Sequence, residues 1–179
     1  LQRGGGITVY FNEILRRMET DLADGFQLLV YAGSAANQDY LPVSTNIRSI
    51  RVAERYRHCP VPGQASLFHS SYYRLPDRRV PVVTTVHDFI YERFGSGPRR
   101  WLHSWQKFAA IRASQAVICI SESTRRDLRQ FLPDVQPERL HVVHNGVSSA
   151  FYPLAPEAVA EAAGRPYVLF VGARSGYKN

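Results

Sequence analysis

The sequence of 179 residues predicts an α/β fold, a doubly wound and mostly parallel sheet, and two patterns carry this prediction. Short, β-rich and nearly all-apolar runs recur along the chain, as is typical of parallel strands that are buried on both faces. Stretches with helical periodicity lie between these runs, and strands that alternate with helices indicate a doubly wound sheet with right-handed crossovers. The expected strands are 27–31, 47–52, 66–69, 81–87, 116–121 and 140–144, and the expected helices are 7–22, 101–111 and 123–132.

The first expected helix follows a run of glycines. Large apolar side chains recur at helical spacing over 7–22, which places them on one face and the charged side chains on the other. Gly25 is expected to end this helix. A doubly wound domain has a strand before such a helix, so we expect that the first strand is missing from this sequence.

The two later helices have clearer boundaries. Over 101–111 we expect Trp101 and Trp105 to lie in the core or at an interface rather than to form a platform for sugar. The helix over 123–132 stops at a proline, and Ser121 and Ser123 are expected to cap it rather than to act as nucleophiles. Residues 34–64 are mixed in character, with a strand expected near 47–52. Residues 89–100 are expected to form a separate loop.

The end of the chain indicates the beginning of a second domain. We expect residues 1–150 to form the first domain and residues 151–166, which are rich in Ala and Glu, to form a linker. Residues 167–171 are apolar and precede a glycine, so they are expected to be the first strand of the next domain, which begins over 167–179.

Composition excludes several classes of protein. The chain is 45% hydrophobic and 21% charged, which excludes a disordered protein, and its apolar runs are too short to cross a bilayer. Cys59 and Cys119 form neither a disulfide framework nor a zinc site, and free thiols in a reducing cytoplasm are the simpler interpretation.

The formal net charge of +7 suits an anionic partner, which could be nucleic acid, an acidic lipid headgroup or a phosphorylated substrate. A solvated basic surface is the alternative for any single arginine pair. Nucleic acid is not favoured, because no nucleic-acid-binding motif accompanies the charge. The arginine pairs are 16–17, 78–79, 99–100 and 125–126.

Polar side chains follow four consecutive expected strands. Ligands of open parallel sheets bind beyond the carboxyl ends of the strands, so these side chains predict the rim of a polar ligand cleft. The alternative is that these polar side chains only line surface loops and bind no ligand. The rim residues are His69, His87, Asp88, Ser121, Glu122, His144 and Asn145.

Two further motifs suit a phosphate group. The glycine run at 4–6 allows close approach of the backbone, and the helix after it offers unpaired N–H groups; a plain tight turn is the alternative. Arg174 and Lys178 follow the last expected strand and could neutralise a diphosphate, although ordinary surface loops also carry such cations. Neither motif has the pattern of a dinucleotide-binding or P-loop site.

Other catalytic chemistries find no support in the sequence. The histidines lack the spacing of a helical metal site, so we expect no metal. No serine lies in a nucleophile elbow, which argues against a hydrolase triad.

Taken in order, these motifs resemble retaining glycosyltransferase family 4, the group 1 glycosyltransferases. The resemblance covers nearly the whole chain except roughly residues 34–64, and the ordered series is far more specific than any single motif. The matching stretches are GGGITVYFNEILRRM, FHSSYYRLP, VVTTVHDFIYERF, ASQAVICISESTRRDLRQF, LHVVHNGVSSAFYP and YVLFVGARSGYKN.

The resemblance implies a GT-B architecture, in which two Rossmann-like domains face each other across a cleft. The amino-terminal domain, represented here, would hold the acceptor, and the carboxy-terminal domain would hold the nucleotide sugar. It also implies roles for individual residues. Gly5 and Gly6 would approach the donor diphosphate, His87 would contact the transferred sugar, and Asp88 would shape that site.

On the donor side, the resemblance implies that Arg174 and Lys178 bind the diphosphate. Many members have Arg directly after the glycine of this strand, whereas Ala173 intervenes here, so Lys178 is the safer assignment. The segment 145–147 would mark the approach to the interdomain hinge. The family's paired glutamates would lie beyond residue 179, so we expect this chain alone to be inactive.

The resemblance implies transfer of a hexosyl group from a nucleotide-diphosphate sugar to a saccharide or lipid-linked saccharide, with retention and without an obligatory metal or other cofactor. Family tendencies make mannosyl transfer one expectation. The place would be the cytoplasm, with weak peripheral contact to the anionic inner face of a bacterial inner membrane, in polysaccharide or lipopolysaccharide biosynthesis. A sugar-nucleotide epimerase of the same fold and a non-catalytic sugar-nucleotide-binding domain remain open.

Overall fold

The computed structural model describes residues 6–22, 25, 29–32, 46–49, 53–149, 151–153, 155 and 168. The chain divides into two compact units, residues 1–145 and 146–179. The helices and strands below all belong to the first unit. Most of the expected linker 151–166 and nearly all of the expected strand 167–171 lie outside the described residues.

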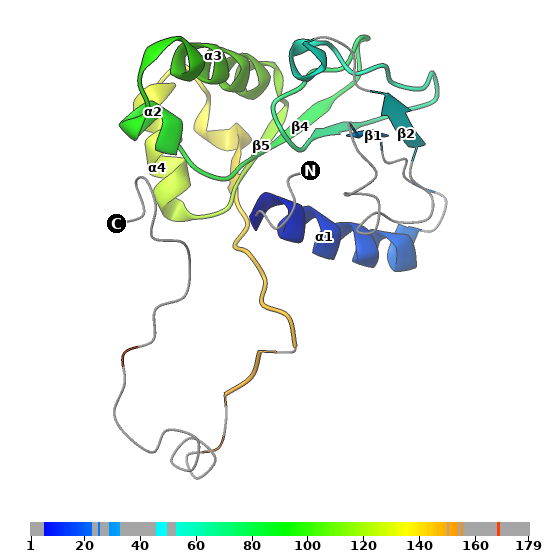
Figure 1. Ribbon diagram of the computed structural model, residues 1–179, viewed down its shortest axis with the longest axis vertical. Helices are drawn as coiled ribbons and strands as arrows, with labels where there is room; N and C mark the ends of the chain where they lie inside the picture. The colour runs from blue at the N-terminus through cyan, green and yellow to red at the C-terminus, as the bar shows by residue number, and fades with distance from the viewer. Residues whose placement is uncertain are drawn as a thin grey trace. The chain divides into compact units, whose positions relative to one another are not determined.

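The first unit is built on a parallel sheet of four strands in the order β3-β4-β5-β6 (Figure 1). Each strand pairs in parallel with its neighbour in the chain, so a crossover must connect each pair. This confirms the predicted α/β fold with a parallel sheet. The strands are β3 (Phe68–Ser70), β4 (Val82–Val86), β5 (Ala116–Cys119) and β6 (Leu140–Val142).

A second, two-stranded sheet precedes the main one in the chain. Its strands are β1 (Leu29–Ala32) and β2 (Asn46–Ser49), which are also parallel. Both were expected from the sequence, with boundaries that differ by a few residues. A short 3-10 helix, η2 (Glu54–Tyr56), follows.

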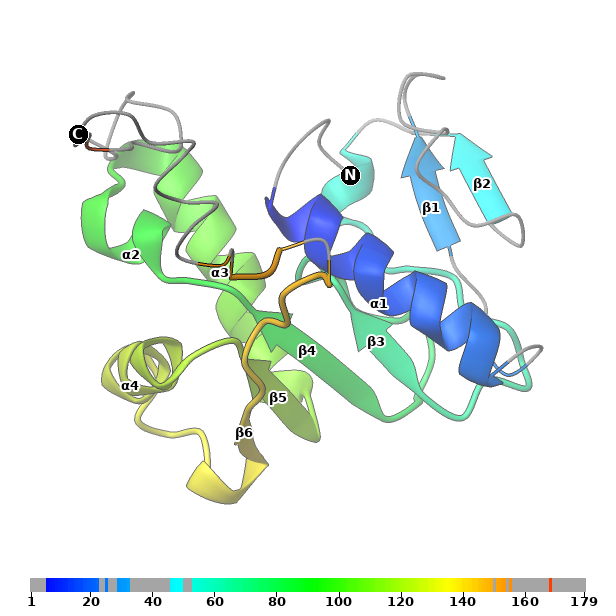
Figure 2. The same cartoon turned by 90° about the horizontal axis from the view of Figure 1, so that it is seen from below.

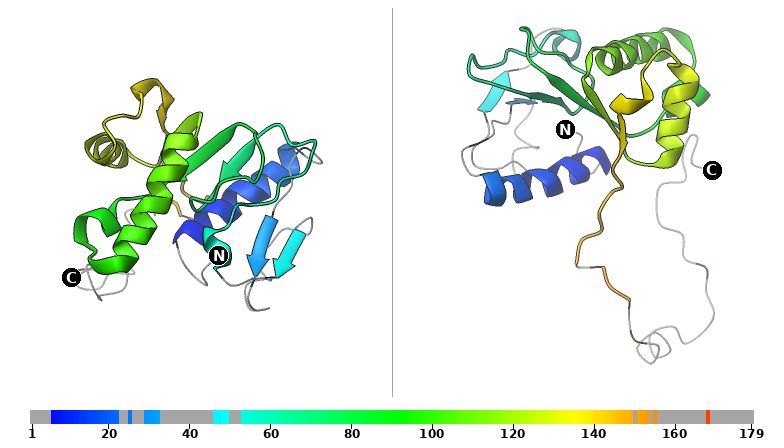
Figure 3. Two further views of the ribbon diagram at one scale, coloured as in Figure 1. Left: turned by 90° about the horizontal axis from the view of Figure 1, so that it is seen from above. Right: turned by 180° about the vertical axis from the view of Figure 1, so that it is seen from behind.

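Helices cover both faces of the main sheet, which gives a three-layer arrangement (Figure 3). α1 (Gly6–Leu22) lies across one face, as Figure 2 shows, and was predicted almost to the residue. The opposite face carries α3 (Gly97–Ala113) and α4 (Glu122–Phe131), which form the crossovers from β4 to β5 and from β5 to β6. The 3-10 helix η3 (Pro137–Arg139) leads into β6.

The prediction that 89–100 is a loop is wrong. A short helix, α2 (Ile90–Phe94), follows β4 directly, and α3 already begins at Gly97. Five residues are too few for helical periodicity to be visible in a sequence. A proline in the first turn of α3 does fit a helix start, because its fixed φ suits that position and no intrahelical N–H bond is lost there.

The alternation of side chains along the strands separates two packed faces. On the side of α3 and α4, Val86, Val117 and Cys119 are fully buried and pack with Ile111 and Leu128 in one apolar cluster. Cys59 and Cys119 are both buried and free, as predicted. Burial raises the pKa of the Cys119 thiol to about 11.

Two polar side chains on this side make local hydrogen bonds. The hydroxyl of Thr84, on β4, lies 2.7 Å from the hydroxyl of Ser114 at the end of α3. Arg139 reaches back to the same helix end, where its guanidinium donates to the carbonyl oxygens of Ile111, Arg112 and Ser114. The carbonyl of Ile111 also accepts from the N–H of Ser114 at 3.2 Å. Because the last carbonyls of a helix lack intrahelical partners, Arg139 acts as a carboxy-terminal cap for α3.

Candidate active site

The register of the sheet brings three strand ends to one edge. Val86, Cys119 and Val142 are paired neighbours at the ends of β4, β5 and β6. The ladder continues one step further, because the N–H of Ile120 donates to Val86 O at 3.3 Å and that of Val143 donates to Cys119 O at 3.0 Å. The residues that follow these strands therefore share the carboxyl edge, where parallel sheets bind their ligands.

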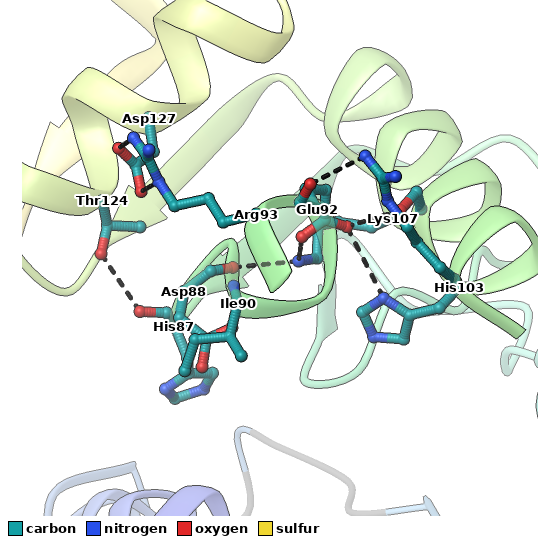
Figure 4. Close-up of polar contacts among 11 residues, drawn as sticks. His87, Asp88, Ile90, Glu92, Arg93, His103, Lys107, Thr124 and Asp127 are labelled. Atoms are coloured by element: carbon teal, nitrogen blue, oxygen red, sulfur yellow. Dashed lines mark hydrogen bonds and ion pairs between the residues drawn. The ribbon is translucent and has the colours of Figure 1, made fainter. Parts of the chain in front are cut away.

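His87 is the first residue beyond β4 and turns toward α1 (Figure 4). Its ring lies edge-on to Tyr10, with centroids 5.1 Å apart, and 5.9 Å from the ring of Phe11. Burial lowers the pKa of His87, an effect that the charge of Asp88 only partly opposes. Its Nε2 atom is buried and has no hydrogen-bond partner within the described part of the chain. The lowered pKa favours the neutral imidazole at neutral pH.

His69 lies inside β3, where it pairs with Val83, and the strand extends one residue further, to Ser70. Its side chain lies on the α1 side, 5.8 Å from the ring of Phe11, and its Nε2 lies 2.8 Å from the hydroxyl of Thr85. Desolvation lowers the pKa of His69. It therefore supports the packing of α1 rather than extending beyond the strand.

Two consecutive backbone carbonyls at the end of β4 are held by side chains from different helices. The hydroxyl of Thr124, on α4, donates to His87 O at 3.1 Å. The ammonium group of Lys107, on α3, donates to Asp88 O at 2.9 Å (Figure 4). The exposed Asp88 carboxylate accepts from the N–H of Ile90 at 3.2 Å and so closes the turn into α2. The peptide groups that follow His87 and Asp88 are therefore both held from the face of the sheet that carries α3 and α4.

Behind this turn lies a buried ion pair that the sequence did not indicate. Lys107 Nζ lies 2.7 Å from Glu92 Oε2, and the two side chains are 0% and 2% exposed. Burial alone would raise the pKa of Glu92, but the neighbouring His103, Lys107 and Ser104 outweigh it and lower this pKa to about 2. Burial likewise lowers the pKa of Lys107, and Glu92 opposes that change.

The remaining rim residues have local roles. The hydroxyl of Ser121 accepts from the N–H of Thr124 at 3.1 Å, which confirms the predicted helix cap, whereas Ser123 lies inside α4. Glu122 is exposed and pairs with Arg125 at 2.8 Å. His144 and Asn145 are exposed beyond β6, at the same edge as His87.

The predicted diphosphate residues fall largely beyond what the structure describes. Gly5, Arg174 and Lys178 lie outside the described residues, so their roles stay predictions. Gly6 is the first residue of α1, and a Cβ placed on it would meet no atom of another described segment within 4 Å. The first turn of this helix therefore has open space beside it, as the binding of a phosphate requires.

Trp101 and Trp105 were expected in the core or at an interface. They are not core residues, so the first of these expectations is wrong. They are 68% and 56% exposed on one face of α3, and Phe94, at the end of α2, is 70% exposed. Among the residues that the structure describes, no group of metal-binding side chains occurs. Within the same residues, no helix combines the length and apolarity that a bilayer crossing requires.

The comparison with protein families agrees with this geometry. The model of glycosyltransferase family 4 matches residues 4–151, from the glycine loop to just beyond β6. The chain belongs to this family. It is also similar to two curated proteins named alpha-maltose-1-phosphate synthase, from Mycolicibacterium smegmatis and Mycobacterium tuberculosis, with 36% and 30% identity over 107 residues. Each match covers 52% of this chain and 27% of the relative, so the chain spans about a quarter of the length of these relatives.

Proposed function

We propose that this chain forms the acceptor-side part of a retaining glycosyltransferase that moves a hexosyl group from a nucleotide-diphosphate sugar to an acceptor. The observation that carries the proposal is His87: a neutral imidazole with an unpaired, buried Nε2 at the carboxyl edge of a parallel sheet. A buried nitrogen without a partner is costly, and a sugar hydroxyl would satisfy it.

The reaction needs stabilisation of charge on the departing diphosphate. The open first turn of α1, at Gly6, offers N–H groups and the positive end of a helix dipole for this purpose. Gly5, Arg174 and Lys178 are proposed to contribute to the same diphosphate contact. No covalent nucleophile is proposed, and the chemistry requires neither a metal nor another cofactor.

The acceptor is proposed to be a saccharide, free or lipid-linked. The names of the relatives describe the synthesis of alpha-maltose 1-phosphate, a phosphorylated disaccharide. This favours a small phosphorylated saccharide among the candidates, and the chain's net charge of +7 suits such an anionic acceptor.

The direct test is an assay of the full-length enzyme with its donor-binding domain. Nucleotide sugars, including GDP-mannose, are offered with and without saccharide and sugar-phosphate acceptors, and the product is identified by proton NMR of its anomeric centre. Acceptor-dependent release of nucleoside diphosphate with a retained anomer supports the proposal. Epimerisation of the nucleotide sugar without an acceptor would instead favour an epimerase, and binding without turnover would favour a non-catalytic domain.

We also propose that the enzyme works in the cytoplasm with weak peripheral contact to an anionic membrane surface. Trp101 and Trp105 lie one turn apart on α3, and the exposed arginines at 99–100 precede them. Exposed indole rings beside cationic side chains suit the headgroup region of an acidic bilayer.

Vesicle flotation tests this contact. The double variant Trp101→Ala/Trp105→Ala should lose its binding to acidic vesicles, whereas Leu67→Ala, which removes an exposed apolar side chain elsewhere, should retain it. Equal binding of the unmodified protein to acidic and neutral vesicles would discard the proposal.

A further inference from the structure

The segment between β4 and α2 is held at two successive carbonyl groups, and this arrangement suggests a function for buried groups that no substrate can reach. We propose that Lys107 and Glu92, together with Thr124, are positioning residues: they fix the backbone of the His87–Asp88 segment so that the His87 imidazole meets the reacting sugar at the correct place. This inference rests on the proposed function, because it concerns the same site.

Lys107 holds the carbonyl of Asp88 although its own position is unfavourable for a cation. Its ammonium group is 0% exposed and lies over the rings of Phe89 and Tyr73, at 4.7 and 5.4 Å from their centroids. The same group donates to Asp88 O and to the carboxylate of Glu92, at 2.9 and 2.7 Å. A cation removed from water in this way brings a large desolvation cost, and well-packed apolar side chains would stabilise a fold at least as well. We explain the presence of a buried lysine at this position by its hydrogen bond to the carbonyl of Asp88.

Glu92 provides the second contact, because its hydrogen bonds connect α2 to α3. Its carboxylate accepts from Ser104 at 2.8 Å as well as from Lys107, and its own carbonyl accepts from Arg100 at 2.8 Å. The chain from Asp88 to Glu92 is therefore attached at both ends to α3. Figure 4 shows these contacts converging on Lys107 and Glu92 from α2 and α3.

Thr124, on α4, provides the third contact that holds this segment. It lies in the first turn of α4 and holds His87 O, one residue before the carbonyl that Lys107 holds. With β4 on one side and α2 on the other, the peptide after His87 has little freedom to rotate. The imidazole then keeps its place against Tyr10 and Phe11 of α1. A displacement of about 1 Å in a group that contacts substrate is enough to lower a rate strongly.

The test uses the full-length enzyme and two readouts, hydrogen exchange of the segment 87–91 and steady-state kinetics. Lys107→Met/Glu92→Met removes both charges together, so no uncompensated ion is left in the core, and a methionine suits the aromatic surroundings of Lys107. Thr124→Val removes the other donor with little change in volume. Leu132→Ala serves as the control, because Leu132 is fully buried in the apolar cluster and its side chain makes none of the polar contacts described above.

We expect the double variant to exchange the amides of 87–91 about tenfold faster and to lose about tenfold in kcat, with donor KM changed by less than about threefold. Thr124→Val should change both quantities in the same direction but less. Leu132→Ala should lower the melting temperature while leaving exchange over 87–91 and kcat, measured well below its own transition, as in the unmodified enzyme.

The proposal is overturned if exchange over 87–91 stays unchanged in the double variant, or if exchange accelerates and kcat does not fall. It is also overturned if Leu132→Ala reproduces both effects, because the loss would then follow general destabilisation. Absence of transfer by the unmodified enzyme would instead sink the proposed function. The exchange data would still decide whether these side chains hold the segment.

Discussion

Removal of only one member of the buried pair should damage the fold far more than removal of both. Glu92→Met leaves the Lys107 ammonium, which is 0% exposed, without the carboxylate that lies 2.7 Å away. Breaking a buried pair in this way costs about 3–5 kcal/mol. The lowering of the Glu92 pKa from 4.5 to about 2 corresponds to an upper value of about 3 kcal/mol, reduced where water screens the carboxylate. The two figures agree in order of magnitude.

Several consequences can be measured on the 179-residue chain, whose two tryptophans both lie on α3 and report its unfolding. For a domain of this size each kcal/mol shifts the melting temperature by about 2–4 °C, so Glu92→Met should lower it by roughly 6–20 °C. Lys107→Met/Glu92→Met should recover most of that loss. Urea unfolding followed by tryptophan fluorescence gives the free energies for the complete double-mutant cycle.

The pH dependence supplies an independent check of the same reasoning. A carboxyl group whose pKa is lowered on folding stabilises the protein above its unfolded pKa of 4.5, and this stabilisation is lost as pH falls toward about 2. The unmodified chain should therefore lose about 3 kcal/mol more than the double variant between about pH 5 and about pH 2. Parallel losses in the two proteins, or a cost of less than about 1 kcal/mol for Glu92→Met alone, would refute the reasoning.

Three further substitutions test other contacts. His87→Ala should lower the transfer rate of the full-length enzyme about a hundredfold or more with the melting temperature nearly unchanged, and an unaltered rate would remove His87 from the site. Ser121→Ala should cost about 1 kcal/mol through loss of the helix cap, and Ser121→Asp should restore most of it in urea unfolding. Arg139→Met should lower the free energy of unfolding by about 1–3 kcal/mol, because carbonyls at the end of α3 lose their guanidinium donor. The control Arg112→Met breaks an exposed ion pair and should have little effect on this free energy. Equal losses in the two variants would contradict the capping role of Arg139.

Most of the main sheet could be predicted from the sequence because its strands are buried on both faces. The runs that became β4, β5 and β6 are nearly continuous in apolar residues, and that pattern marks parallel strands strongly. The bounds of β3 were less certain, since His69 is polar: the expected strand 66–69 ended at His69, whereas β3 extends to Ser70. The helix α2 carries no periodic signal at five residues, so only the structure reveals it.

Some residues of the candidate site could likewise be predicted from the sequence, and others could not. His87 and Ser121 were predictable because each directly follows a strand with a clear pattern, and strand ends meet at one edge. Lys107 and Glu92 were not, because a charged residue in an amphipathic helix is expected to face solvent. Nothing in the sequence indicates that Lys107 and Glu92 meet across a turn, since their pairing depends on how α2 folds back against α3. Tyr10 and Phe11 were expected only as apolar residues of a helix face, and their contact with His87 is a tertiary feature.

The last residue of β5 also provides a native reporter of folding. Cys119 is fully buried between the sheet and its helices, and with a pKa of about 11 its sulfur is almost entirely protonated at neutral pH. Alkylating reagents attack the thiolate, so this cysteine should react only in molecules whose sheet has opened. The rate at which iodoacetamide modifies Cys119 would therefore follow opening of the sheet residue-specifically, without a dye or an engineered label.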